Sequence, residues 1–123
     1  MGLIPQSDEE FLEGHPYEYS LKQCGDDIHL ILKGVKFPEQ YAPRTADVLL
    51  ILPTGYPNAK MDMFRTRPDI KFVNGSWPDR ADVHVDLGGE SWQQWSRHYE
   101  WRDGIDGLRT FIASVHKEIS LGV

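Results

Sequence analysis

Three consecutive residues in the second half of the chain have the side chains needed for acyl transfer: Ser96, Arg97 and His98. A serine hydroxyl becomes a nucleophile when a general base takes its proton, and histidine is the usual base. A neighbouring guanidinium can stabilise an oxyanion or bind a carboxylate. We therefore predict Ser96 as nucleophile, His98 as base and Arg97 as ligand of the oxyanion or of a C-terminal carboxylate. A serine among polar residues is also a common helix cap or solvated hydroxyl, so a structural role for Ser96 stays open.

Two further serines and one cysteine are alternative nucleophiles. Ser91 can equally be a helix N-cap with Gln94 as its capping-box partner. Ser76 lies in an Asn-Gly-Ser sequence that is typical of a turn. The only cysteine, Cys24, falls at an expected hairpin with little around it to activate the thiol, so we expect it to be inert and partly buried.

The remaining histidines are weaker candidates. His84 alternates with apolar residues and lies between Asp82 and Asp86. A carboxylate could orient its ring, but an exposed strand face is the expected setting. A turn, a strand and the C-terminal helix are the expected positions of His15, His29 and His116. No spacing of cysteine and histidine resembles a zinc site, and we expect neither a metal nor a cofactor.

Length and composition limit the class of protein. A chain of 123 residues is expected to form one domain, spanning residues 1–123. Its hydrophobic content of 40% predicts a packed core, and its net charge of −6 argues against a nucleic-acid partner. The longest apolar run has five residues, against about 20 for a membrane-spanning helix. We expect no signal peptide, no membrane partner and a cytoplasmic location.

Periodicity predicts the elements that position these side chains. A first helix is expected to start with Ser7 as its cap and Glu10 as the capping-box partner. Strands are expected at residues 17–23, 28–32, 47–52 and 61–66, followed by a long loop with at most short elements at residues 67–89. A last helix is expected at residues 105–119, with one buried face formed by Ile105, Leu108, Ile112, Val115 and Ile119. The sequence therefore predicts an α+β domain with a four-stranded antiparallel meander.

Three stretches in this order carry a resemblance to a known family: residues 52–57 (LPTGYP), 92–98 (WQQWSRH) and 101–110 (WRDGIDGLRT). They resemble the ubiquitin-conjugating fold. The resemblance is closer to a prokaryotic family of that fold that is encoded beside multi-ubiquitin-like proteins and ubiquitin-activating-type adenylating enzymes. It implies that Tyr56, Pro57 and Trp101 structure a groove. It also implies a ubiquitin-like protein, including a multi-domain one, and an activating enzyme as partners.

The departures from the family pattern concern the catalytic position. Conjugating enzymes carry a His-Pro-Asn sequence whose Asn stabilises an oxyanion, whereas this chain has Asp69, which cannot donate a hydrogen bond while ionised. Counting forward from there puts the usual cysteine at residues 76–78, and counting back from Trp101 puts it near Gln93. Neither position holds a cysteine. The resemblance therefore implies either transfer through a hydroxyl, as an oxyester of a ubiquitin-like C-terminus, or an inactive binding scaffold. Counting alone therefore does not fix the catalytic position.

We also expect both Trp92 and Trp95 to be mostly buried, on one side of a helical turn.

Overall fold

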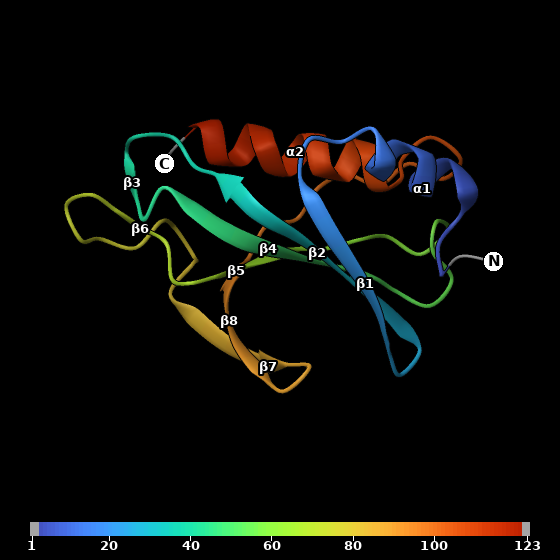
Figure 1. Ribbon diagram of the computed structural model, residues 1–123, viewed down its shortest axis with the longest axis horizontal. Coiled ribbons are helices and arrows are strands. Elements are labelled where there is room, and N and C mark those ends of the chain that lie inside the picture. The colour runs from blue at the N-terminus through green and yellow to red at the C-terminus, as the bar shows by residue number, and fades with distance from the viewer. Residues whose placement is uncertain (1–2, 122–123) are drawn as a thin grey trace.

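A computed structural model of the chain describes residues 3–121. Two helices lie on one side of an antiparallel sheet (Figure 1), which confirms the predicted α+β class and is consistent with a ubiquitin-conjugating fold. In chain order the elements are α1 (Gln6–Glu13), β1 (Glu18–Cys24), β2 (Asp27–Lys36), β3 (Tyr41–Ala42), β4 (Thr45–Leu52), β5 (Phe64–Arg67), β6 (Lys71–Phe72), β7 (Val83–Leu87), β8 (Glu90–Trp95) and α2 (Leu108–Leu121).

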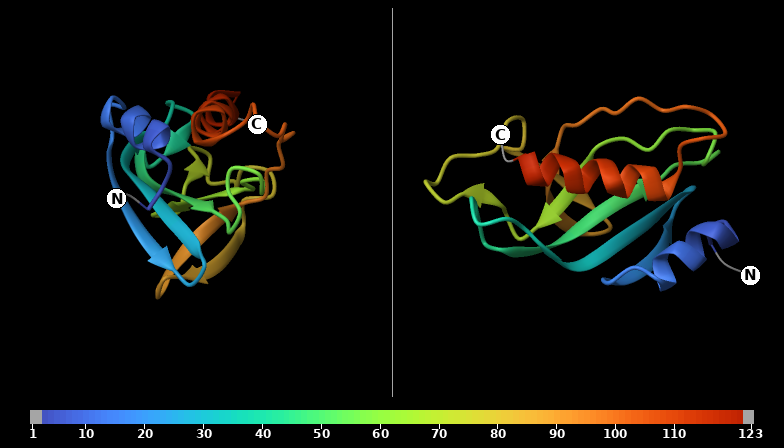
Figure 2. Two further views of the ribbon diagram at one scale, coloured as in Figure 1. Left: turned by 90° about the vertical axis from the view of Figure 1, so that its right-hand side faces the viewer. Right: turned by 90° about the horizontal axis from the view of Figure 1, so that it is seen from above.

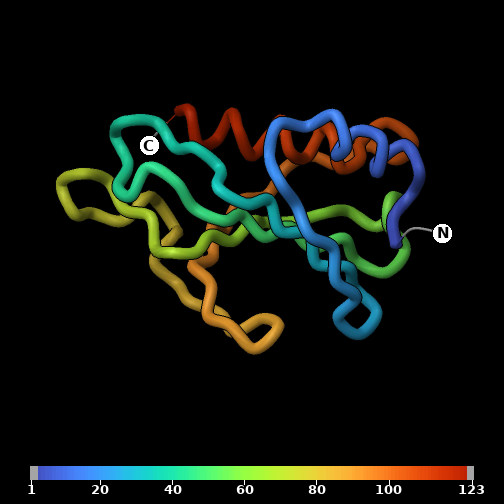
Figure 3. The backbone as a smooth tube through the Cα atoms, viewed as in Figure 1, coloured from blue at the N-terminus to red at the C-terminus, as the bar shows by residue number. Residues whose placement is uncertain are grey.

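The main sheet has the strand order β1-β2-β4-β5-β8-β7, and β3 and β6 form a separate short ladder. The predicted four-stranded meander corresponds to β1, β2, β4 and β5. The segment predicted as a long loop contains β6 and β7, and β7 forms a hairpin with β8. This hairpin extends the sheet and lies on the side opposite α2 (Figure 3).

The core lies between the sheet and α2. Alternate residues of β2 and β4, among them Leu30 and Leu50, are buried toward the helix, as period-two strands require. The buried residues of α2 are Leu108, Phe111, Ile112, Val115 and Ile119. Both tryptophans of β8 are buried, but the expected helical turn is wrong. Because Trp92 and Trp95 are three residues apart on a strand, they point to opposite faces of the sheet.

Three predicted boundaries are also wrong. The first helix starts at Gln6, because the amides of Asp8 and Glu9 donate to the Pro5 carbonyl, and Ser7 makes no capping bond. The fourth strand starts at Phe64. The last helix starts at Leu108, so Ile105 lies in the preceding turn and is 64% exposed. A turn held by local hydrogen bonds can continue an apolar spacing without continuing the helix.

The turn at residues 53–57 joins both helices to the sheet. The Tyr56 hydroxyl donates to Asp8 Oδ2 (2.6 Å) and accepts from the Leu108 amide (2.7 Å). The Trp101 indole donates to the Pro57 carbonyl (3.0 Å). These contacts hold the loop before β5 and the loop before α2 together along one side of the helix (Figure 2). No helix within residues 3–121 is long and apolar enough to cross a membrane.

Candidate functional site

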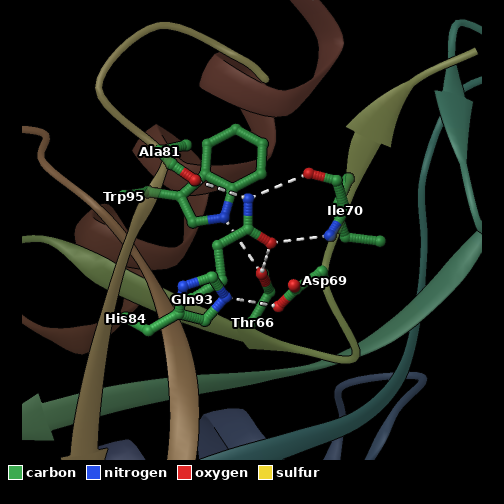
Figure 4. Close-up of polar contacts among 7 residues, drawn as sticks. All are labelled: Thr66, Asp69, Ile70, Ala81, His84, Gln93 and Trp95. Carbon is green, nitrogen blue, oxygen red and sulfur yellow. Dashed lines mark hydrogen bonds and ion pairs between the residues drawn. The ribbon is translucent and has the colours of Figure 1, made fainter. Parts of the chain in front are cut away.

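A buried amide organises the centre of the β5-β8-β7 end of the sheet. Gln93 has no exposed surface, and its Oε1 accepts from the Ile70 amide (2.6 Å) and from Thr66 Oγ1 (2.9 Å). Its Nε2 donates to the carbonyls of Ile70 (2.9 Å) and Ala81 (2.8 Å), and Trp95 Nε1 donates to Thr66 Oγ1 (3.0 Å; Figure 4). All the donors and both acceptor sites of the amide are used. Gln93 therefore has a structural role that ties together three segments.

Residues 76–78 and Gln93, the two positions at which counting places the usual cysteine, lie close together in this part of the sheet. His84 is directly opposite Gln93 in the β7–β8 ladder, and the ring of Trp77 lies edge-on to the His84 imidazole with 5.8 Å between centroids. Counting forward from Asp69 and counting back from Trp101 therefore lead to the same region, because Trp77 and Gln93 are both neighbours of His84. The intervening sixteen or so residues form the approach to β7, the strand itself and most of β8.

An aspartate–histidine pair lies at the exposed edge of this region. The Nε2 atom of His84 is 2.9 Å from Oδ1 of Asp69, and the two side chains are 40% and 49% exposed. Asp69 is held in place because its neighbour Ile70 is bonded to Gln93 through both backbone groups. In the neutral ring, donation from Nε2 to Asp69 leaves Nδ1 as the basic nitrogen. This Nδ1 makes no hydrogen bond within residues 3–121.

The hairpin ladder brings Ser91 to the same face as this pair. His84 is opposite Gln93 and Asp86 is opposite Ser91. Residues two apart on a strand point to one face, so His84, Asp86 and Ser91 share a face of the hairpin. Ser76, by contrast, donates its hydroxyl to Asn74 Oδ1 (2.6 Å) within the expected turn.

The predicted Ser96 cluster forms a second site, immediately after β8. The Ser96 amide donates to the Arg80 carbonyl (3.1 Å), whereas its hydroxyl makes no hydrogen bond within the described residues 3–121. His98 Nδ1 lies 2.8 Å from Asp62 Oδ1. The two segments are aligned because the Met63 amide donates to the Arg97 carbonyl (3.0 Å). The sequence contained no local signal for Asp62, which is 36 residues from its partner.

Arg97 faces the helix. Its Nε lies 3.0 Å from Glu118 Oε2 of α2, its side chain is 10% exposed, and its guanidinium carbon is 5.5 Å from the centre of the Trp95 ring. A further nitrogen donates to the Ser96 carbonyl (3.2 Å). The structure thus places Ser96, Arg97 and His98 next to one another but gives the guanidinium a partner on α2.

The other predicted residues lie away from both pairs. Cys24 ends β1, at the hairpin expected for it, and is partly buried. A pocket of about 380 Å³ lies between α1 and the start of α2, and both Tyr56 and Pro57 line it. None of the predicted nucleophiles borders this pocket. Across residues 3–121, no group of three or more His, Cys, Asp or Glu side chains is arranged to hold a metal ion.

A family model described as Prokaryotic E2 family E matches residues 4–121, which include both aspartate–histidine pairs and every strand of the sheet. Comparison with curated proteins and with solved structures gives no significant match.

Proposed function

Because this chain belongs to the prokaryotic E2 family E, which gives it a conjugating-enzyme-like role, we propose that it carries a ubiquitin-like protein as an oxyester. In this proposal an activating enzyme delivers the C-terminal acyl group of the ubiquitin-like protein. The acyl group is held on a serine of this chain and then passes to an acceptor nucleophile. The partners are a ubiquitin-like protein, including one with several such domains, and the activating enzyme.

The single observation that carries the proposal is the Asp62–His98 pair, whose histidine is two residues from Ser96 in the sequence. Donation from Nδ1 to Asp62 leaves Nε2 of His98 as the base, which is the arrangement found in serine–histidine–aspartate triads. Ser96 Oγ forms a bond to the acyl carbonyl carbon and gives its proton to His98. The bond to the leaving thiolate or phosphate oxygen breaks, and an amine or hydroxyl later displaces Oγ, which recovers a proton.

Arg97 fits this proposal as a positioning residue. Its ion pair with Glu118 anchors the segment between Ser96 and His98 to α2. The ion pair is partly buried, so removal of one partner leaves a poorly solvated charge and loosens the segment. To bind the oxyanion, the Arg97 guanidinium would have to leave Glu118 and pair with the substrate instead.

A binding scaffold is the second candidate function. The observation that favours it is Gln93, whose amide is fully used by the structure at one of the two positions expected for the usual cysteine. A scaffold of this kind would bind the ubiquitin-like protein and its activating enzyme without forming a covalent bond.

The experiment mixes the chain with its cognate ubiquitin-like protein, activating enzyme and ATP, and measures intact mass. An adduct that resists thiol reductant, is cleaved by hydroxylamine and is lost in Ser96→Ala supports the oxyester at Ser96. The matched control is Ser120→Ala, which changes an exposed serine on α2 and should keep the adduct. A noncovalent complex without adduct supports the scaffold. An adduct that survives Ser96→Ala but is lost in Cys24→Ala contradicts the proposal.

A further inference from the structure

The Asp69–His84 pair is not used by the proposed reaction at Ser96. Three residue steps separate Gln93, which is opposite His84, from Ser96, a distance of about 10 Å along an extended chain. Ser91, a diagonal neighbour of His84 on the hairpin, is therefore a nearer hydroxyl than Ser96. We propose that Ser91, His84 and Asp69 form a second acyl-accepting centre, which takes an acyl group from an activated ester or thioester.

The geometry of the hairpin supports this centre. Ser91 and His84 are diagonal neighbours on one face, a position at which Cα atoms are about 7–8 Å apart. This separation is within the combined reach of a serine and a histidine side chain. The two side chains are not hydrogen-bonded in the structure, and catalytic hydrogen bonds commonly shorten only when substrate binds. Both are exposed, so an acyl donor can reach them.

The imidazole is held in one orientation by Asp69, as Figure 4 shows, and by the ring of Trp77. Asp69 accepts from its Nε2, Trp77 packs edge-on against its ring, and the Gln93 amide fixes the segment that carries Asp69. The ammonium group of Lys71 lies over the Trp77 ring, with Nζ 4.4 Å from the ring centre. A base whose ring is fixed in advance loses little entropy when it takes a proton.

The charges near the pair define the class of substrate. Asp86 is directly opposite Ser91, and Asp82 lies just before β7, two residues from His84 in the sequence. Together with Asp69 they place three carboxylates near Ser91 and His84. They repel an anionic acyl group. The centre should therefore accept acyl groups that are neutral or positively charged near the reacting carbonyl.

The chemical step balances within these three residues and the acyl donor. Ser91 Oγ bonds to the carbonyl carbon, and its proton moves to Nδ1 of His84. The bond from that carbon to the leaving alkoxide or thiolate breaks, and the leaving group takes the proton from His84. Water or an amine can then release the acyl group from Ser91.

The test uses the chain alone with p-nitrophenyl acetate, and follows p-nitrophenolate release together with the site of acetylation by peptide mass analysis. In a Ser96→Ala background, which removes the nucleophile of the other centre, we expect one hydroxylamine-sensitive acetyl group on Ser91. Ser91→Ala should abolish it, and His84→Gln should slow it by at least about tenfold. Asp69→Asn should slow it by lowering kcat, with KM unchanged. The matched controls Ser120→Ala and Asp79→Asn, both at exposed sites, should leave the rate unchanged.

Three outcomes overturn the proposal: no acetylation of Ser91, acetylation of Ser91 at an unchanged rate in His84→Gln, or equal labelling of several serines. Circular dichroism of each variant shows that the fold is retained. Because the reaction contains neither a ubiquitin-like protein nor an activating enzyme, its failure leaves the oxyester at Ser96 standing. Likewise, loss of the Ser96 adduct leaves this centre standing.

Discussion

Replacement of Gln93 by alanine should lower the free energy of unfolding by about 4 kcal/mol. The amide makes four buried hydrogen bonds, to Thr66, to both backbone groups of Ile70 and to the Ala81 carbonyl. A buried hydrogen bond contributes about 1 kcal/mol net, and the four together give the expected loss. Stability of a domain is about 5–15 kcal/mol, so this change should remove a large part of it.

The measurement is urea unfolding followed by circular dichroism, in which the midpoint should fall while the slope m stays constant. The matched control is Gln94→Ala. Gln94 is the next residue on β8, is half-buried, and accepts a single hydrogen bond from Arg65 Nε (3.3 Å). This control should cost less, about 2 kcal/mol, because it loses one hydrogen bond to a guanidinium. Equal losses for the two variants would refute the reasoning, because burial and the number of hydrogen bonds are what distinguish them.

Two further predictions concern the helices. Tyr56→Phe removes the hydroxyl that joins Asp8 to the Leu108 amide, and it should cost about 2 kcal/mol of unfolding free energy, read from the urea midpoint; an unchanged midpoint would show that water replaces both bonds. The rings of His15 and His116 stack with 6.0 Å between their centroids. Burial lowers the pKa of both histidines, and the charge of His116 lowers the pKa of His15 further. The unfolded chain therefore binds more protons, so the stability due to these rings is complete above about pH 6.5 and is lost as the pH falls through their lowered pKa values. Urea midpoints from pH 7.5 to 5.5 should decline, and less steeply in His15→Asn/His116→Asn; identical slopes would contradict the assignment.

The fold class was predictable because period-two and helical spacings are local properties of the chain. The residues of β1 alternate, β2 and β4 contain short apolar runs typical of buried strands, and the apolar spacing of α2 is continuous from Leu108. The β7–β8 hairpin was missed because its strands are short and its neighbours are rich in glycine and proline. Local spacing also misplaced Ile105, since a turn held by the Asp106 carboxylate interrupts the helix there.

The pairing of the histidines was beyond the reach of sequence patterns. His98 was a candidate base from its neighbours, but its aspartate comes from the segment before β5. His84 was expected to be exposed, which it is, yet its partner Asp69 was identified only as a departure from the family pattern. Each pair depends on strands that meet across the sheet, and only the register of β5, β8 and β7 shows which residues meet.

The two aspartate–histidine pairs are the observation on which the proposal of transfer without a cysteine rests. A cysteine thiol ionises near pH 8.5, so it reacts as a carrier with little assistance, whereas a serine hydroxyl needs a base in place to take its proton. Loss of the thiol alone would leave a scaffold. Here each of two histidines is paired with an aspartate, through Nδ1 at His98 and through Nε2 at His84. Ser96 is two residues from His98 in the sequence, and Ser91 is a diagonal neighbour of His84 in the hairpin. A scaffold needs no reactive serine, so the reactivity of Ser96 and of Ser91 decides between binding and catalysis.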